Sequence, residues 1–217
     1  MQLVRLLISG GIVMIPLLGF SIVAIALVAE RTVFWLRNNR RQEVLVKRVL
    51  AMVSSGNLYE ALALLQKNLN LPIARIFFAA LKLDAPTPEE FKLALESEAQ
   101  AEIPTLRRFM TIFDTIISVA PLLGLLGTVL GLITSFASLN LSNIGSSSTT
   151  GVTGGISEAL VSTASGLVVA IFTLMFANAF RSLYQRQKAY IQEYGGQLEL
   201  LHRRAYEKGK ELSHAVV

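Results

Sequence analysis

Long stretches without a charged side chain are the feature of this sequence that most limits how it can fold. No Asp, Glu, Lys or Arg occurs at positions 6–29, 115–157 or 159–180. A helix of about 20 residues crosses a hydrocarbon core roughly 30 Å thick, so these stretches leave room for three crossings. Only 16% of the residues are charged, against about 25% in ordinary soluble domains. The chain is therefore predicted to be an all-α membrane protein with three transmembrane helices and long cytoplasmic helical extensions.

Basic residues indicate the direction of each crossing, because cytoplasmic segments carry an excess of Lys and Arg. They follow the first apolar run (Arg31, Arg37, Arg40, Arg41, Lys47, Arg48), precede the second (Arg107, Arg108) and follow the third (Arg181, Arg186, Lys188). We therefore expect a multi-pass protein of the inner (plasma) membrane. Its predicted order is a periplasmic N-terminus with the first transmembrane helix at 1–30, a cytoplasmic helical domain at 31–109, a transmembrane helix at 110–139, a periplasmic loop at 140–155, a third transmembrane helix at 156–180 and a cytoplasmic C-terminal helix at 181–217.

A cleaved signal peptide is the alternative for the first run, since Ala24, Ala26 and Ala29 lie near its end. The charges favour a membrane anchor, because a signal peptide has its positive charges before the apolar stretch and only Arg5 precedes this one. The net charge of +5 does not indicate a nucleic-acid partner, because the basic residues form no separate module with interleaved aromatics.

The predicted cytoplasmic domain carries a strong helix-start signal. Thr87 offers a capping hydroxyl, Pro88 suits the first helical position, and Glu90 lies three residues after the cap. From there the pattern leads on toward the second crossing, so one helix is predicted to continue from the cytoplasm into the membrane. Pro104 is predicted to kink it.

Small side chains follow one side of each of the last two crossings, at spacings that share a helix face. These rows are Gly124, Thr128, Gly131 and Ser135 in the second, and Ala159, Thr163, Gly166, Ala170 and Thr173 in the third. Small residues let helices approach closely in lipid, so simple packing is one interpretation. The other is that several copies arrange these rows around a common axis and form a smooth corridor.

Glu158 is the one acid between the second and third crossings, and about 20 residues counted back from Arg181 place it near the outer boundary. A role at a channel mouth or in a contact between subunits is favoured over that of a mid-channel proton carrier. A corridor lined by these rows lacks a ring of acids at mid-membrane, so it does not form a complete cation filter by itself.

Several kinds of chemistry are not indicated. The chain has no cysteine, and its two histidines, His202 and His214, lie apart in the polar tail, so no metal ligand is predicted. It also lacks a Gly-rich phosphate loop and a nucleophile paired with a base, so neither a catalytic residue nor a cofactor is expected. These features are not those of an enzyme.

Two blocks resemble signatures of the MotA/TolQ/ExbB proton channel family. Residues 120–129, Ala-Pro-Leu-Leu-Gly-Leu-Leu-Gly-Thr-Val, resemble the second-span signature, and residues 155–160, Gly-Ile-Ser-Glu-Ala-Leu, with Thr163 and Gly166, resemble the third-span signature. Three spans with a large cytoplasmic insert are similar to the ExbB and TolQ branch rather than to MotA, which has an additional span. The chain departs from the family pattern at Phe172, where a proline is common, and at Pro104.

The resemblance implies a ring-shaped homo-oligomer, a pentamer, in lipid, whose second and third spans line a central pore. It implies an ExbD/TolR-type single-span partner that carries the proton on an aspartate. Thr128 and Thr163 match the pore-facing threonines of the family, and Glu158 matches its third-span glutamate. The implied function is to energise outer-membrane transport through a TonB-like protein with the proton motive force. TolQ-type envelope maintenance and a non-conducting membrane scaffold are the alternatives.

Overall fold

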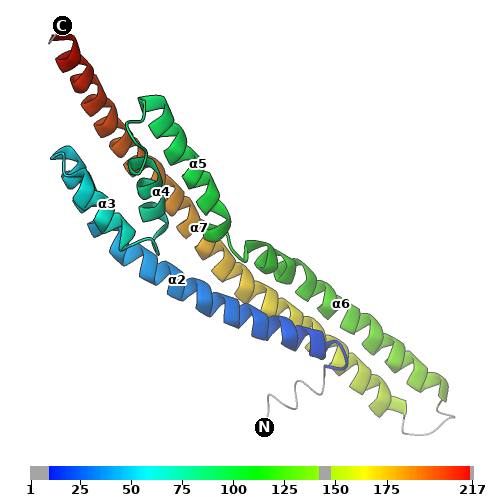
Figure 1. Ribbon diagram of the computed structural model, residues 1–217. Coiled ribbons are helices and arrows are strands. Elements are labelled where there is room, and N and C mark those ends of the chain that lie inside the picture. Colours follow the sequence, from blue (N-terminus) through cyan, green and yellow to red (C-terminus); the bar gives the residue numbers. More distant parts are fainter. Residues whose placement is uncertain (1–9, 142–147, 216–217) are drawn as a thin grey trace. The chain divides into compact units, whose positions relative to one another are not determined.

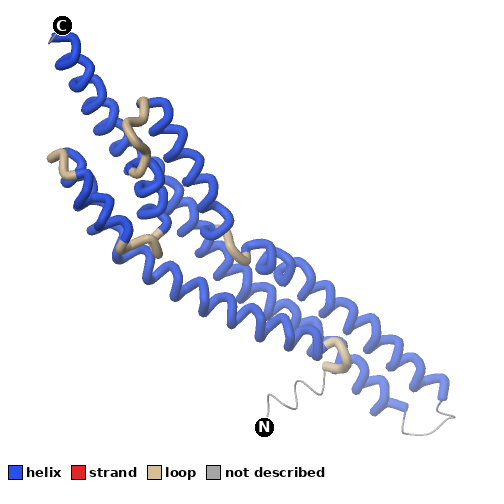
Figure 2. Tube along the Cα trace, viewed as in Figure 1, coloured by secondary structure: helices blue, strands red, loops and turns tan. Residues whose placement is uncertain are grey.

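The computed structural model describes residues 10–141 and 148–215, which form helices joined by turns (Figures 1 and 2). The helices are α2 (Met14–Ser54), α3 (Leu58–Gln66), α4 (Pro72–Leu81), α5 (Pro88–Leu106), α6 (Met110–Leu141) and α7 (Ser148–Ala215). Within these residues no strand occurs, so the prediction of an all-α chain is confirmed for them. The chain divides into two compact units, Met1–Arg31 with Phe109–Phe180 (unit 1) and Thr32–Arg108 with Arg181–Val217 (unit 2).

Three helical stretches are long and apolar enough to cross a membrane, within Met14–Ser54, Pro88–Ser138 and Gly151–Gly209. Only 22–28% of the residues in their most apolar windows are buried inside the subunit. Large side chains such as Ile12, Leu122 and Val168 are more than half exposed. An apolar surface this extensive requires a cover other than water, and lipid hydrocarbon provides one.

Unit 1 is a bundle of the first part of α2, α6 and the first part of α7. Its buried cluster joins side chains from all three helices, among them Leu17 of α2, Ala120 of α6 and Ala170 of α7. Leu17 is 2% exposed and Ala120 is fully buried. The small residues of α6 and α7 let these two helices approach closely. The larger side chains of α2, such as Leu17, then pack against the pair.

Unit 2 is held together by packing and by buried polar contacts. Arg75 of α4 forms a bidentate ion pair with Glu102 of α5, whose side chain is 8% exposed. This pairing raises the pKa of the Arg75 guanidinium, chiefly through the hydrogen bonds to Glu102. A buried carboxylate without such a partner is strongly unfavourable, so the pair fixes α4 against α5.

The parts of α2 and α7 in unit 2 are joined by buried amides. Asn38 Nδ2 donates to Gln187 Oε1 at 3.2 Å, and Gln187 Nε2 donates to Gln42 Oε1 at 2.8 Å. Farther along α7, the ring of His202 stacks on Phe91 of α5 with centroids 4.1 Å apart, and its Nε2 lies 3.0 Å from the carbonyl oxygen of Pro86. The long C-terminal helix is therefore packed against both α2 and α5.

The predicted helix start at Thr87 is confirmed. The backbone N–H of Glu90 donates to Thr87 Oγ1 at 3.3 Å, and the backbone N–H of Thr87 donates to Glu90 Oε2 at 2.8 Å. This reciprocal pair satisfies two donors that the first turn of a helix leaves without intrahelical partners.

The prediction of one helix from the cytoplasm into the membrane is wrong, because α5 ends at Leu106 and α6 begins at Met110. Between them Phe109 adopts a φ of 68°, the left-handed conformation that ends helices. Pro104 lies inside the last turn of α5 and has no N–H to donate, which weakens the hydrogen-bond ladder just before the break.

The expected loop at 140–155 is also mostly helical. Helix α6 continues to Leu141 and α7 begins at Ser148, while residues 142–147 lie outside the described part of the chain. The early turns of α7 lie against the end of α6, where Ser135 Oγ is 3.3 Å from the carbonyl oxygen of Val152 and Gly155 approaches Ser135 closely. Tertiary pairing thus extends a helix through a segment whose composition is that of a loop.

Candidate functional site

Helices α6 and α7 approach one another backbone to backbone. A Cβ atom built on Gly166 would lie 2.5 Å from the carbonyl oxygen of Ala120, and one on Gly124 would lie 3.0 Å from the Cα of Thr163. A Cβ on Gly131 would lie 2.7 Å from the carbonyl oxygen of Gly155. Backbone atoms cannot move aside as a flexible side chain can, so Gly131 and Gly166 leave no room for a side chain and Gly124 leaves little. The pairs run in opposite directions along the two helices, so the helices are antiparallel.

We call this close contact between α6 and α7 the seam. Most residues of the two predicted small-residue rows are buried along it and in the core beside it. The buried members are Gly124, Gly131, Ser135, Ala159, Gly166, Ala170 and Thr173. The two interpretations of the rows were packing within lipid and the wall of a corridor. Their burial and close contacts inside one subunit are what the packing interpretation expects.

The two predicted threonines are half-buried and both use their hydroxyl hydrogens within the subunit. Thr163 Oγ1 donates across the seam to the carbonyl oxygen of Gly124 at 2.9 Å. Thr128 Oγ1 donates along its own helix to the carbonyl oxygen of Leu125 at 2.6 Å. A carbonyl only accepts, so each hydroxyl must be the donor, and its remaining lone pairs can accept a hydrogen bond from another group.

Ser162 and Gly127 belong to the same seam, although the periodicity of the two rows does not select them. Ser162 Oγ donates to the carbonyl oxygen of Ala159 at 2.9 Å and lies 3.4 Å from that of Gly124. A Cβ on Gly127 would lie 2.2 Å from Ser162 Oγ and 3.7 Å from the Cβ of Val13. The second glycine of the Gly-Leu-Leu-Gly stretch is the signal that could have identified this contact with Ser162 and with Val13 just before α2.

Glu158 of α7 contacts the turn just before α2 rather than the seam. Its carboxylate packs on Gly11, where a Cβ would lie 1.7 Å from Glu158 Oε1, and Gly11 has a φ of 70°. The neighbouring Gly10 approaches Val161 of α7, since its Cβ would lie 3.3 Å from Val161 Cγ1. The glutamate is therefore half-buried in a contact within the subunit. The Gly10-Gly11 pair near the start of the first apolar run is the sequence signal of this contact.

These features define a multi-pass helical membrane protein with a close-packed antiparallel helix pair that presents two acceptor hydroxyls. The family model described as MotA/TolQ/ExbB proton channel family matches residues 68–193, which include α4, α5, α6 and the whole apolar part of α7. The chain belongs to this family, and it is ExbB-like.

Two relatives place it within the family. The ExbB-like protein 3 of Synechocystis sp., a biopolymer transport protein by its assigned name, is 57% identical over 207 residues, which cover 95% of this chain and 98% of that protein. The Tol-Pal system protein TolQ of Haemophilus influenzae is 29% identical over 212 residues, which cover 91% of this chain and 90% of TolQ. The similarity to both extends over nearly the whole length, so it includes the helices outside the seam.

Proposed function

We propose that this chain is the stator subunit of an inner-membrane proton channel that uses the proton motive force, with an ExbD/TolR-type single-span partner, to energise outer-membrane transport through a TonB-like protein. In this proposal several copies, five by analogy with the family, surround the partner helices. The basic clusters support an orientation with the N-terminus in the periplasm and the C-terminus in the cytoplasm.

The observation that carries the proposal is the absence of an acid within the apolar spans. Positions 115–157 and 159–180 contain no ionisable Asp or Glu, and Glu158 between them is engaged with Gly11. A proton path through this subunit therefore lacks a mid-membrane carrier of its own. An intramembrane acid supplied by a second polypeptide would complete the path, which supports a two-component channel.

The hydroxyls of Thr128 and Thr163 favour one protonation state of such an acid. Because both hydrogens are donated to carbonyl oxygens of the subunit, the two oxygens can act toward a partner only as acceptors. A protonated carboxyl group can donate to an acceptor, whereas a carboxylate cannot and is repelled by its lone pairs. A threonine position would then hold the neutral acid and release the ionised one, so protonation would move the partner from one position to the next.

The available energy is sufficient to drive such steps. One elementary charge that crosses the membrane releases about 2.3 kcal/mol per 100 mV of potential. A hydrogen bond between side chains in a membrane contributes only about 0.6–2 kcal/mol. The potential can therefore break one threonine contact with each proton, provided that the partner exchanges positions in single steps.

Substitution of both threonines tests the proposal. The Thr128→Val/Thr163→Val variant, produced with its partner, is expected to assemble normally and to lose proton-driven uptake and proton flux in vesicles. The Thr128→Ser/Thr163→Ser variant is the matched control, because it retains both hydroxyls and is expected to keep most activity. Unchanged uptake in the valine variant would contradict the proposal.

A TolQ-type role in envelope maintenance is the second candidate, supported by the alignment with TolQ along nearly the whole chain. A genetic test separates the two roles. Deletion of the gene should abolish uptake of a TonB-dependent nutrient under the first proposal, and should make the envelope leak periplasmic protein under the second. Vesicles that hold the assembled complex yet show no proton flux would instead favour a non-conducting scaffold.

A further inference from the structure

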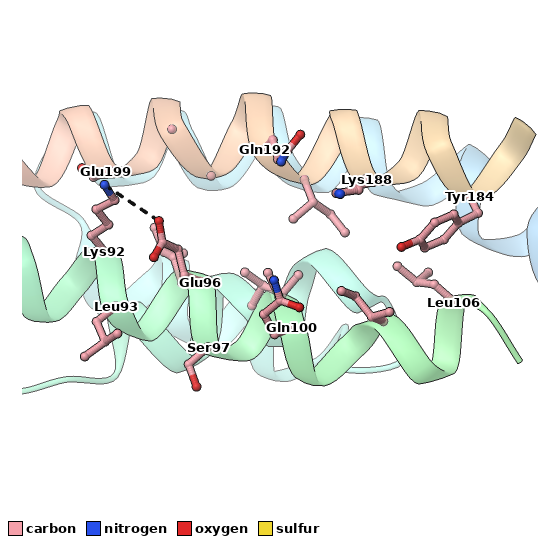
Figure 3. Close-up of a pocket in the computed structure, with 17 residues that line it drawn as sticks. Lys92, Leu93, Glu96, Ser97, Gln100, Leu106, Tyr184, Lys188, Gln192 and Glu199 are labelled. Carbon is pink, nitrogen blue, oxygen red and sulfur yellow. Dashed lines mark ion pairs between the residues drawn. The ribbon is translucent and has the colours of Figure 1, made fainter. Parts of the chain in front are cut away.

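The charged side chains that line the groove between α5 and α7 balance one another. Figure 3 shows this groove of unit 2, which has a volume of about 550 Å³, with Lys92 beside Glu96 on the α5 wall. Lys92 Nζ lies 3.8 Å from Glu96 Oε1, and Lys188 and Glu199 carry opposite charges on the α7 wall. The lining of the groove therefore has no excess of charge that would select a charged ligand.

An acid on α6 has different surroundings, because it is set among apolar side chains and hydroxyl groups. Asp114 is exposed and follows Arg108, the last basic residue before α6. It is the one charged residue of α6, whose large exposed side chains, such as Leu122, Leu125 and Phe136, are apolar. Ionisable residues in membrane helices almost always face a bundle interior or a water-filled cavity, and they mark ion pathways. Asp114 is therefore a candidate for a role in ion transport.

Asp114 lies on the same face of α6 as Thr128. It precedes Thr128 by about four turns of an α-helix, or about 21 Å along the helix axis. In the proposed function the hydroxyl oxygen of Thr128 accepts a hydrogen bond from the partner's acid. If Thr128 faces the axis of the channel, Asp114 faces the same axis nearer the cytoplasm.

Hydroxyl groups surround Asp114 on the exposed side of the first turns of α6. Thr111, Thr115 and Ser118 are all exposed and share one side of the helix. Thr115 Oγ1 donates to the carbonyl oxygen of Thr111 at 2.9 Å, and Ser118 Oγ donates to that of Asp114 at 2.9 Å. The two hydroxyl oxygens retain lone pairs that can accept from water or from a hydronium ion. This part of the face is therefore suited to contact with water, unlike the apolar part around Leu125.

We propose that Asp114 is the group through which protons leave the channel on the cytoplasmic side. The inference rests on the proposed function, since it assigns the end of a proton path that passes through the partner's acid. In a ring of subunits, each copy contributes one Asp114 to the cytoplasmic mouth. Rings of Asp or Glu are the means by which cation channels select cations. Such a ring favours a hydronium ion over an anion where the proton enters the cytoplasmic water.

The proposed step leaves the aspartate unchanged after each proton. A hydronium ion in the corridor transfers its proton to a carboxylate oxygen of Asp114, so an O–H bond forms on the aspartate and a water molecule remains. The protonated side chain then gives that proton to a cytoplasmic water molecule, and the carboxylate is restored. Positioned side chains that transfer protons in this way accelerate reactions by about 10²–10⁴-fold in enzymes.

Proton flux in vesicles tests the assignment. Asp114→Asn, produced with its partner, is expected to assemble normally and to lower the flux at least about tenfold, because an amide cannot take up and return the proton. Asp114→Glu keeps a carboxylate and should stay within about threefold of the native flux. Asp84→Asn is the matched control, because Asp84 is exposed between α4 and α5 and its loss changes the net charge equally. Equal flux in Asp114→Asn and Asp84→Asn would overturn the proposal.

A buffer that cannot cross the membrane separates proton transfer from a structural role. At high concentration on the cytoplasmic side, it can accept the proton in place of the missing carboxylate, so it should restore flux in Asp114→Asn. It should not restore flux in Thr128→Val/Thr163→Val, whose defect lies at the contact with the partner. Failure of the buffer to restore flux in Asp114→Asn would assign the loss to structure and contradict the proposal.

Cysteine labelling gives a measurement that does not depend on flux. Because the native chain has no cysteine, Ser118→Cys in the assembled complex is expected to react with a membrane-impermeant thiol reagent added on the cytoplasmic side. Ile112→Cys is the matched control, since Ile112 is 41% exposed and lies nearer the start of α6 on the side opposite Asp114. Labelling of Ser118→Cys that is absent, or no faster than that of Ile112→Cys, would contradict the proposal.

The outcomes also separate this inference from the proposed function. If the threonine variant loses flux while Asp114→Asn keeps it, the two-component channel stands and the exit lies elsewhere, so only this inference fails. If both variants keep the native flux, the proposed function fails together with it.

Discussion

The carboxylate of Glu158 occupies the space that a side chain at position 11 would need. A Cβ on Gly11 would lie 1.7 Å from Glu158 Oε1 and 2.7 Å from the carboxyl carbon. The contact brings the start of α2 against α7 within unit 1. Glu158 therefore has a structural role inside the subunit, whatever further part it takes at the mouth of an assembled channel.

Gly11→Ala should destabilise the protein for two separable reasons. An alanine with a φ near 70° is strained by about 1–2 kcal/mol, and its methyl group would also clash with Glu158. The Gly11→Ala/Glu158→Ala double variant should recover the second loss but not the first. Thermal unfolding in detergent measures both.

Gly19→Ala is the control for this pair, because its Cβ would meet nothing within 4 Å on α2. It should be neutral or should stabilise the protein by up to about 1 kcal/mol. If Gly11→Ala unfolds at the same temperature as Gly19→Ala, the contact between Gly11 and Glu158 does not contribute to the stability of the protein.

Gly166→Ala should force α6 and α7 apart, because the new methyl group would lie 2.5 Å from the carbonyl oxygen of Ala120 and 3.2 Å from the Cα of Gly124. Overpacking of this kind costs about 1–3 kcal/mol. Gly154→Ala on the same helix faces open space and should have no such effect. Comparison of their melting temperatures checks the prediction, and a Gly166→Ala variant as stable as Gly154→Ala would refute it.

Thr163→Val should have little effect on stability. The lost bond to the carbonyl oxygen of Gly124, 2.9 Å long, is a side-chain bond between helices, and such bonds contribute about 0.6 kcal/mol on average in membrane proteins. Thr163→Ser should be indistinguishable from the native protein. A loss above about 2 kcal/mol in Thr163→Val would mean that its effects on transport report unfolding rather than function.

The capping box of α5 predicts a pH dependence. The backbone N–H of Thr87, and then its hydroxyl, hold the pKa of Glu90 below its ordinary value of 4.5. A carboxyl group with a lowered pKa contributes stability above that ordinary pKa and loses it as the pH falls through the lowered one. Thr87→Ala should raise the pKa of Glu90 toward 4.5, because the hydroxyl contribution is lost while the backbone N–H remains.

Carbon NMR of labelled glutamate side chains, titrated between pH 6 and pH 2, would follow this change in the pKa of Glu90. Thr87→Ser, which keeps a hydroxyl, should leave the titration unchanged. Loss of the cap itself should cost about 1 kcal/mol at neutral pH. An unaltered Glu90 titration in Thr87→Ala would show that the hydroxyl does not hold the carboxylate in solution.

Sequence reasoning succeeded where the signal is local. The helix start at Thr87 depends on three neighbouring residues, and its hydrogen bonds were predictable from them. It failed where tertiary pairing decides, as at 148–155, whose Gly, Ser and Thr content indicates a loop. That segment is helical because its small residues allow it to pair with the end of α6 near Ser135.

The end of α5 was missed for a related reason. Pro104 is visible in the sequence and predicts a disturbance, but a proline can kink a helix or precede its end. The left-handed conformation of Phe109 is what ends the helical path. Phenylalanine carries no preference for that conformation, so nothing in its residue type announces the break.

The sequence by itself determined the class of protein, the spans and the two faces of small residues, because transfer of side chains into lipid depends on composition and helical spacing alone. Only the tertiary structure decided what those faces meet. A row of small residues has the same spacing whether it packs inside a subunit or surrounds an axis. The distances of Gly124, Gly131 and Gly166 to opposing backbone atoms place them at a close contact between α6 and α7, and contacts between residues so far apart along the chain arise only when the helices pack.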